Sequence, residues 1–404
     1  MMYTSILFAH VGLMLCFAIA VAALSPQLFS CQVQKPTGVS PLEGCPSDTV
    51  FVSQNRADPF AQFHSIQDAI QALPDSGSFV ILVGAGEYHE TINITRRGPL
   101  TLVGQIAAEA SLPSTRTANI SESNLVQIWD NKFVVPGMDD ADSAVLSVAP
   151  SRDAALIGAG PTGAPLQPLS GNADFKAYNI DFQNRAANFS ISQALVTDIS
   201  YANASFYGCS FASYQDTWYT GRNASTYVVD SVIFGQTDYL FGFGTAWFED
   251  VVLANRACGG GIVAWKGTNQ TDAPGNRYGA YVSNSRIARS PDANTTVVTA
   301  DRCFLGRPWN DLATTVFLRT NMDDSIRPEG WTPFNSDRPT IMNTTFYAEY
   351  KSSGAGGDTS HRIPLEHLLS DEEARKFTIP LVFGERQPSW IDFSYIHGNT
   401  PATV

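Results

Sequence analysis

Two aspartates and a distant arginine are the residues of this chain whose types and surroundings could do chemistry. Asp216 and Asp238 lie 22 residues apart, each within an aromatic-rich run, and Arg307 lies far downstream in the run Leu-Gly-Arg-Pro-Trp at 305–309. A carboxylate among aromatic residues is costly to bury without a partner, and an arginine can hold such a carboxylate ionised. The structural alternative is that the aspartates bond backbone amides in turns and that the arginine forms an ordinary ion pair.

A serine-esterase triad is not expected. The chain has six histidines and no Gly-x-Ser-x-Gly sequence, which carries the nucleophile in α/β-hydrolases. The spacing of the cysteines does not resemble a zinc site. We therefore expect a site that uses neither a metal nor a cofactor.

The elements that must position these residues are short β-type runs. Six of them begin at residues 179, 208, 231, 250, 284 and 321, at intervals of 29, 23, 19, 34 and 37 residues. The shorter intervals fit one coil of a parallel β-helix, and the longer ones fit coils with inserted loops. A β-sandwich would show turn signals every ~8–12 residues, which are not regular here. We predict an all-β chain folded as a right-handed parallel β-helix, or solenoid.

Two helical segments are predicted outside these coils. Residues 65–73 place Ile66, Ala69, Ile70 and Leu73 on one face, which predicts a helix that caps the N-terminal end of the solenoid. Residues 365–377 contain Ser-Asp-Glu-Glu at 370–373, a sequence that is typical of a helix start. We therefore expect short helices near the C-terminus.

The N-terminal residues read as a secretory signal. The first 24 residues contain no Asp, Glu, Lys or Arg, are apolar from Ile6 to Leu24, and include Ala-Val-Ala at 20–22. We predict a signal peptide at 1–23, an extension at 24–46 and a catalytic β-helix domain at 47–404. An uncleaved anchor is the alternative, because a positively charged start is missing and the apolar stretch is long enough to span a bilayer.

Glycosylation and disulfide signals also favour the exterior of a cell. Eight Asn-x-Ser/Thr sequons occur, at Asn93, Asn119, Asn188, Asn203, Asn223, Asn269, Asn294 and Asn343. Removal of the signal would leave five cysteines, an odd number, so at least one thiol is expected to be free. Cys31 and Cys45 are candidates for a disulfide in the extension, and Cys209 is expected to be a small buried core residue.

Composition limits the partners. The 404 residues are 44% hydrophobic, and the net charge is −13 with a pI near 4.8. Since no Lys/Arg-rich stripe exists to neutralise phosphates, nucleic acid is not an expected partner. An acidic polymer would be bound best where its charge is masked, or at acidic pH.

Several ordered motifs together resemble the pectinesterase, or pectin methylesterase, family over residues 47–390. The matching segments are Gly-Glu-Tyr-His-Glu at 86–90, Gln-Ala-Leu at 193–195, Gln-Asp-Thr-Trp at 215–218, Asp-Tyr-Leu-Phe-Gly at 238–242, Leu-Gly-Arg-Pro-Trp at 305–309, Met-Asp-Asp at 322–324 and Pro-Glu-Gly-Trp at 328–331. The family fold is a right-handed parallel β-helix, in agreement with the coil spacing. Trp218, Tyr239 and Leu240 depart from the usual residues of the family, and the two aspartates are one residue further apart. The chain resembles the shorter fungal-like type, without an inhibitor-like pro-region.

The resemblance implies a role for each candidate residue. Asp238 would be the nucleophile that attacks the methyl-ester carbonyl, paired with Arg307. Asp216 would be the general acid that protonates departing methanol and then the base that activates water, for which its pKa must lie above that of Asp238. Gln193 and Gln215 would donate N–H groups to the oxyanion.

The implied partner is methylated polygalacturonate. Tyr219, Phe241 and Trp309 match aromatic positions of the family's substrate groove, although stacking within the coils is an alternative for each. We expect the mature protein to be a secreted enzyme, extracellular or in the cell wall. It is expected to be a monomer and to be free of the membrane after signal cleavage. A β-helix polysaccharide lyase with an acidic calcium site and a basic proton acceptor is one alternative. The other is a wall-binding homologue without catalysis, which would be expected to have lost Asp216, Asp238 or Arg307.

Overall fold

The computed structural model describes residues 26–108, 124–158, 166–268 and 278–395. The predicted signal peptide at 1–23 and the sequons at Asn119 and Asn269 lie outside these residues. Within the described segments, none of the helices has the length and apolar character that crossing a membrane requires.

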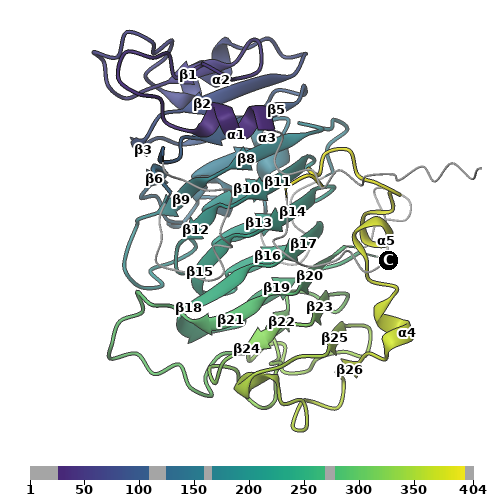
Figure 1. Ribbon diagram of the computed structural model, residues 1–404. Helices are drawn as coiled ribbons and strands as arrows, with labels where there is room; N and C mark the ends of the chain where they lie inside the picture. The colour runs from purple at the N-terminus through teal and green to yellow at the C-terminus, as the bar shows by residue number, and fades with distance from the viewer. Residues whose placement is uncertain (1–25, 109–123, 159–165, 269–277, 396–404) are drawn as a thin grey trace, which may run out of the picture.

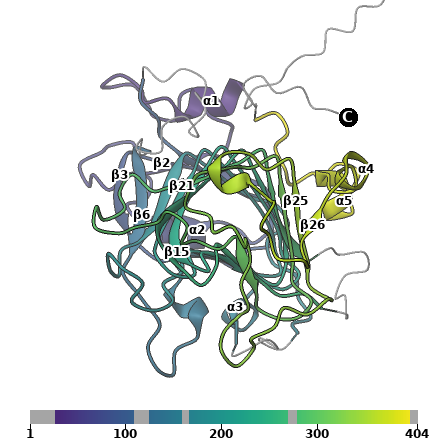
Figure 2. The same ribbon diagram turned by 90° about the horizontal axis from the view of Figure 1, so that it is seen from below.

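Three parallel sheets wind around one axis to form a right-handed β-helix, as predicted (Figure 1). The central coils each contribute one strand to each sheet, so that the sheets run along the molecule and enclose a common interior (Figure 2). The eleven-stranded sheet contains β1 (Val50–Val52), β2 (Phe79–Val83), β5 (Leu100–Gly104), β8 (Phe175–Tyr178), β11 (Asn203–Tyr207), β14 (Ser225–Val229), β17 (Thr245–Glu249), β20 (Gly279–Ser283), β23 (Thr314–Leu318), β25 (Phe346–Tyr350) and β26 (His367–Leu368).

The other two sheets are slightly shorter. The eight-stranded sheet contains β3 (Gly86–His89), β6 (Val126–Asp130), β9 (Ile180–Asn184), β12 (Ser210–Ala212), β15 (Val232–Thr237), β18 (Val252–Gly259), β21 (Arg286–Arg289) and β24 (Asn321–Met322). The seven-stranded sheet contains β4 (Ile92–Ile94), β7 (Leu146–Val148), β10 (Thr197–Ile199), β13 (Trp218–Thr220), β16 (Leu240–Gly242), β19 (Val263–Trp265) and β22 (Gly306–Pro308). The six β-type runs found in the sequence are β9, β12, β15, β18, β21 and β24, which are consecutive neighbours in the eight-stranded sheet.

The same corner recurs between the eleven-stranded and eight-stranded sheets. One residue in the left-handed region makes this corner in successive coils, at Asn179 (φ 53°), Gly208 (φ 58°), Asp230 (φ 49°), Asp250 (φ 47°), Asn284 (φ 49°) and Arg319 (φ 51°). Asn, Asp and Gly tolerate this conformation best. The sequence therefore encodes five of these six corners with a residue type that bends the chain at low cost, and Arg319 is the exception.

The interior is filled by stacked aromatic rings from successive coils. Phe182 stacks on Phe211 with ring centroids 5.7 Å apart, and Trp218 meets Phe211 edge-on at 4.8 Å. These side chains are fully buried. Burying such a side chain stabilises the fold by ~1.5–3 kcal/mol, and the edge and stacked contacts add to that.

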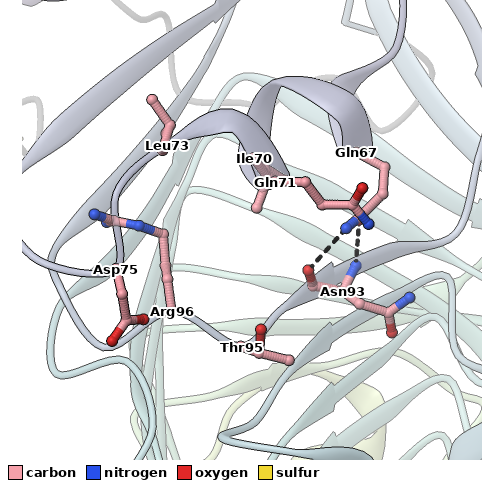
Figure 3. A pocket seen from close by; sticks show the side chains of 8 residues that line it. All are labelled: Gln67, Ile70, Gln71, Leu73, Asp75, Asn93, Thr95 and Arg96. Carbon is pink, nitrogen blue, oxygen red and sulfur yellow. Dashed lines mark hydrogen bonds between the residues drawn. The ribbon is translucent and has the colours of Figure 1, made fainter.

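Helix α2 (Ile66–Ala72) caps the N-terminal end of the solenoid, as predicted, and buries Ile66, Ala69 and Ile70 in the core. Ser65 caps the helix by accepting a hydrogen bond from the backbone of Asp68. In Figure 3 the side chain of Gln67 reaches from α2 to β4, where it donates to the backbone oxygen of Asn93 and accepts from its N–H. Since β4 is the last strand of its sheet, the amide of Gln67 satisfies an edge that would otherwise be open.

The C-terminal segment covers the outer face of the eleven-stranded sheet (Figure 1). Its helices are α4 (Asp371–Ala374) and α5 (Ile379–Phe383). The predicted helix at 365–377 is thus shorter than expected, because β26 within that range pairs with β25 and extends the sheet. The predicted start is confirmed, since Ser370 and Glu373 form a capping box.

In the described part of the chain, four further helices lie outside the three sheets. They are α1 (Pro26–Gln32), η2 (Asp140–Ser143), α3 (Arg152–Ala155) and η4 (Ala355–Gly357). The structure confirms the Cys31–Cys45 disulfide and the burial of Cys209, which is in neither disulfide, and it adds a second disulfide between Cys258 and Cys303.

Candidate active site

The two aspartates lie where the chain enters neighbouring strands of the seven-stranded sheet. Asp216 precedes β13 by two residues and Asp238 precedes β16 by two residues, and the parallel register pairs Trp218 with Leu240. This register places one aspartate above the other in successive coils. Both are almost fully buried, with 8% and 7% of their surface exposed.

Arg307 lies in β22, with β19 between it and the strand of Asp238. The intervening coil passes the site as Gly259-Gly260-Gly261. A Cβ atom on Gly260 would lie 2.7 Å from Oδ1 of Asp238 and 2.9 Å from Cζ of Arg307, and its φ of 56° also favours glycine. The glycines therefore leave the space in which the arginine reaches across one coil.

Arg307 and Asp238 form a two-pronged ion pair. Nε of Arg307 donates to Oδ1 at 2.9 Å, and Nη2 donates to Oδ2 at 2.5 Å. Oδ1 also accepts the backbone N–H of Gly261 at 3.0 Å. Nη1 of Arg307 donates to the backbone oxygen of Phe334 at 2.5 Å. Such planar, charge-assisted hydrogen bonds hold the carboxylate in a fixed orientation.

Asp216 has a perturbed pKa. Burial raises its pKa well above the ordinary value, and the nearby charges of Asp238 and Asp140 raise it further, while Arg307 acts in the opposite direction. A buried carboxyl with a raised pKa can retain its proton and act as a proton donor.

Two glutamines flank the aspartates, and each accepts a hydrogen bond from a serine hydroxyl. Ser190 donates to Oε1 of Gln215 at 2.7 Å, and Ser192 donates to Oε1 of Gln193 at 2.8 Å. Because each Oε1 atom accepts a hydrogen bond from a serine, the N–H₂ group of each amide remains as a donor. Both glutamines line the same cavity as Asp216 and Asp238.

That cavity has a volume of about 640 Å³ and brings together all five candidate catalytic residues. Phe241 and Trp309 also line it. Tyr219 does not. It is 3% exposed and packs behind Phe241 at a centroid distance of 4.7 Å, because the outer face of β13 is covered by Ile157 and Leu195. Its contribution to the cavity is support for the ring of Phe241.

Several cavity residues were not found from the sequence. The cavity is also lined by Met138, Asp139, Asp140 and Phe334. The strands that precede these residues in the chain belong to the eight-stranded sheet and not to the seven-stranded one. Behind Trp309, Lys266 is fully buried with its Nζ 3.7 Å from the ring centroid, and burial together with the charge of Arg222 lowers its pKa to about 7. In the sequence, the only indication that Lys266 is buried is its position directly after an apolar run.

The match to known families decides between the alternatives. The family model described as Pectinesterase matches residues 168–385, more than half of the 404 residues. The chain belongs to the pectinesterase family. A curated relative in that family, the probable pectinesterase A of Neosartorya fischeri, is 30% identical over 335 residues, which cover 83% of this chain and 87% of the relative.

Other members of the pectinesterase family differ in length. The probable pectinesterase/pectinesterase inhibitor 41 of Arabidopsis thaliana is 28% identical over 82% of this chain, which spans only 52% of that relative. The chain thus spans about half the length of the first plant relatives it matches. Among solved structures, the Aspergillus niger pectin methylesterase is 27% identical with a TM-score of 0.66, covering 87% of this chain and 98% of that one. The carrot pectin methylesterase, 22% identical with a TM-score of 0.67, shows the shared fold.

Proposed function

We propose that this chain is a pectin methylesterase, which hydrolyses the methyl esters of polygalacturonate to methanol and free galacturonate. The observation that carries the proposal is the pairing of an Arg307-bound Asp238 carboxylate with the buried, proton-retaining Asp216 in one cavity. Family membership and a structural neighbour described as a pectin methylesterase in complex with a hexasaccharide, 25% identical, support the same substrate class.

In the first half of the reaction, an oxygen of Asp238 attacks the ester carbonyl carbon. The carbonyl oxygen becomes an oxyanion, which the Nε2–H groups of Gln193 and Gln215 stabilise by roughly 3 kcal/mol per donor. When the tetrahedral species collapses, the bond to the methoxy group breaks and that group takes the proton of Asp216. Methanol leaves, and an acyl-enzyme anhydride joins the substrate to Asp238.

In the second half, the now ionised Asp216 takes a proton from water. The resulting hydroxide attacks the acyl carbon, and collapse releases the galacturonate and regenerates the Asp238 carboxylate. Asp216 is protonated again at the end, so one water is consumed for each methanol released. Arg307 holds the nucleophile in place in both halves.

The cellular setting is also part of the proposal. We infer that the protein is secreted and acts in the cell wall or the medium as a monomer, with residues 47–404 as its catalytic domain. Two disulfides, Cys31–Cys45 and Cys258–Cys303, support an oxidising compartment. Mass spectrometry of the secreted protein would test the cleavage site, and light scattering would test the oligomeric state.

The deciding experiment follows methanol and unsaturated products from highly methylated pectin in the same tubes. The parent is expected to release methanol without unsaturated products, and Asp238→Asn is expected to release at least ~1000-fold less because the amide is not a nucleophile. Asp301→Asn is a matched control, since Asp301 is exposed and also has a positive φ of 54°. Unsaturated products would instead indicate a lyase, and no product from a folded parent would indicate a binding protein.

A further inference from the structure

The mechanism above leaves two carboxyls of the cavity without a role in the reaction, those of Asp139 and Asp140. Asp140 lines the same cavity as Asp216 and Asp238, and it is the first residue of the short helix η2. It is half-buried, so its side chain is neither in the core nor freely in solvent. A carboxyl beside a reaction on a polyanion affects which substrate is accepted.

The neighbouring Asp139 has a structural role that Asp140 does not share. The carboxylate of Asp139 accepts the backbone N–H groups of Ala141, Ile157 and Gly158 at 2.9–3.0 Å, and it thereby fixes the loop before η2. Among the residues that the structure describes, no donor to the carboxyl of Asp140 is found. Its oxygens are therefore available to whatever occupies the cavity.

Charged groups face Asp140 from several elements. Asp139 precedes it on the same loop, Lys266 follows β19, and Asp216 precedes β13. Burial, followed by the charge of Asp139, raises the pKa of Asp140 to about 6, and Lys266 acts in the opposite direction. Because the charge of Asp140 also raises the pKa of Asp216, its field reaches the reacting carboxyls. Above pH 6 this part of the cavity carries a negative charge.

We propose that Asp140 is a specificity-determining residue that selects a methyl-esterified over a free galacturonate unit beside the ester being cleaved. The inference rests on the proposed function. A free carboxylate next to Asp140 meets a like charge in a partly water-excluded cavity, whereas a neutral methyl ester does not, and discrimination of about tenfold is reasonable for such a pair. Each product carboxylate therefore disfavours attack on its neighbour, so that demethylation is scattered along the polymer.

The experiment compares kcat/KM per ester on highly methylated pectin and on pectin randomly saponified to half methylation, at pH 5 and pH 7.5. The parent is expected to prefer the highly methylated substrate more strongly at pH 7.5 than at pH 5. Asp140→Asn is expected to raise kcat/KM on the half-methylated substrate about three- to tenfold relative to kcat/KM on highly methylated pectin at pH 7.5.

The matched control is Asp142→Asn. Asp142 lies in the same short helix, pairs with Arg152 and does not line the cavity, so this variant makes the same change in net charge. Its selectivity is expected to equal that of the parent. Asp140→Ser supplies a second neutral side chain if Asp140→Asn does not fold.

Two outcomes would overturn the proposal. Equal losses on both substrates would mean that Asp140 binds the sugar or holds the site, and an unchanged ratio at both pH values would mean that its charge does not select. If the parent releases no methanol from either substrate, both the proposed function and this inference are overturned. If the parent releases methanol from both substrates without preference, only the inference about selectivity is overturned.

Discussion

Asp216 and Asp238 both have left-handed backbone conformations, with φ of 58° and 47°. Such conformations are uncommon outside glycine, and they cluster at functional sites where the surrounding structure compensates for the strain. Here they turn the chain from the eight-stranded to the seven-stranded sheet in successive coils. The two carboxyls therefore lie side by side, although they are 22 residues apart in the sequence.

A first prediction concerns the stability cost of Asp216. Because its pKa is raised in the folded state, the folded protein holds a proton that the unfolded chain loses. The contribution of Asp216 to stability is thus fully present below the ordinary carboxyl pKa and is lost as pH rises. Asp216→Asn is expected to raise Tm at pH 8 by roughly 2–4 °C and to change it little at pH 4, while lowering kcat by about 100-fold or more.

Calorimetry and methanol assays at both pH values check this prediction. Asp301→Asn again serves as the control, because Asp301 is exposed. A Tm that falls equally at pH 4 and pH 8 would contradict the account, since it would mean that the carboxyl of Asp216 is a net stabiliser.

A second prediction concerns Ser190, which we expect to orient the amide of Gln215. Ser190→Ala should lower kcat about tenfold with little change in KM, less than the ~100-fold or greater effect of losing an oxyanion donor. Ser190→Thr should restore much of the activity because it keeps the hydroxyl. Since Ser190 also completes the sequon of Asn188, Asn188→Gln separates loss of a glycan from loss of the hydrogen bond. A kcat that falls equally in Asn188→Gln would refute the orienting role.

At the scale of elements, the site depends on loops held together between coils. The glycine run at 259–261 passes between Asp238 and Arg307, and the flanking Cys258 is bonded to Cys303, four residues before that arginine. The disulfide thus joins the segment that passes between the two paired side chains to the segment that carries Arg307. The Cys31–Cys45 disulfide lies in the N-terminal extension and has no such neighbour.

A third prediction follows from this difference. Replacing Cys258 and Cys303 by alanine should lower the free energy of unfolding by about 4 kcal/mol, as expected for a loop of this length, and should reduce kcat/KM several-fold. Replacing Cys31 and Cys45 should destabilise the protein by about 3 kcal/mol and leave kcat/KM within twofold. Denaturant titration and methanol assays provide the comparison. Equal activity in the two double variants would show that the second disulfide does not support the site.

At the scale of the whole molecule, the site and the C-terminal segment occupy different sheets. The cavity lies along the seven-stranded sheet, and the C-terminal segment packs on the eleven-stranded sheet, where Asp392 accepts from the hydroxyl of Tyr178 at 2.8 Å. Trp390 is 2% exposed in that packing and meets Phe383 edge-on. We therefore expect the stability that the C-terminal segment contributes to be separable from catalysis.

A fourth prediction tests that separation. Trp390→Ala should lower the free energy of unfolding by about 3–5 kcal/mol because it leaves a large cavity in the outer packing. The kcat/KM on highly methylated pectin should stay within twofold of the parent at a temperature where the variant is folded. Leu381→Ala is a suitable control, since Leu381 is in the same segment but 49% exposed. A parallel loss of activity and stability would indicate that the segment supports the cavity.

The sequence by itself determined the repeating architecture and the chemical trio. The recurrent runs in the sequence correspond to the strands of the eight-stranded sheet. The three residues that the sequence singled out, Asp216, Asp238 and Arg307, line one cavity. These features are local, because a strand, a corner residue and a short motif each depend on a few consecutive residues. The capping helix at 65–73 was found for the same reason.

The tertiary structure decided everything that depends on neighbours from other coils. It paired Cys258 with Cys303, placed Tyr219 behind Phe241, and brought Asp140 into the cavity. In a solenoid each side chain contacts residues one coil away, at separations that vary with the inserted loops, so spacing alone cannot specify those contacts. Burial likewise set the raised pKa of Asp216, because desolvation is a property of the packed molecule and not of the chain.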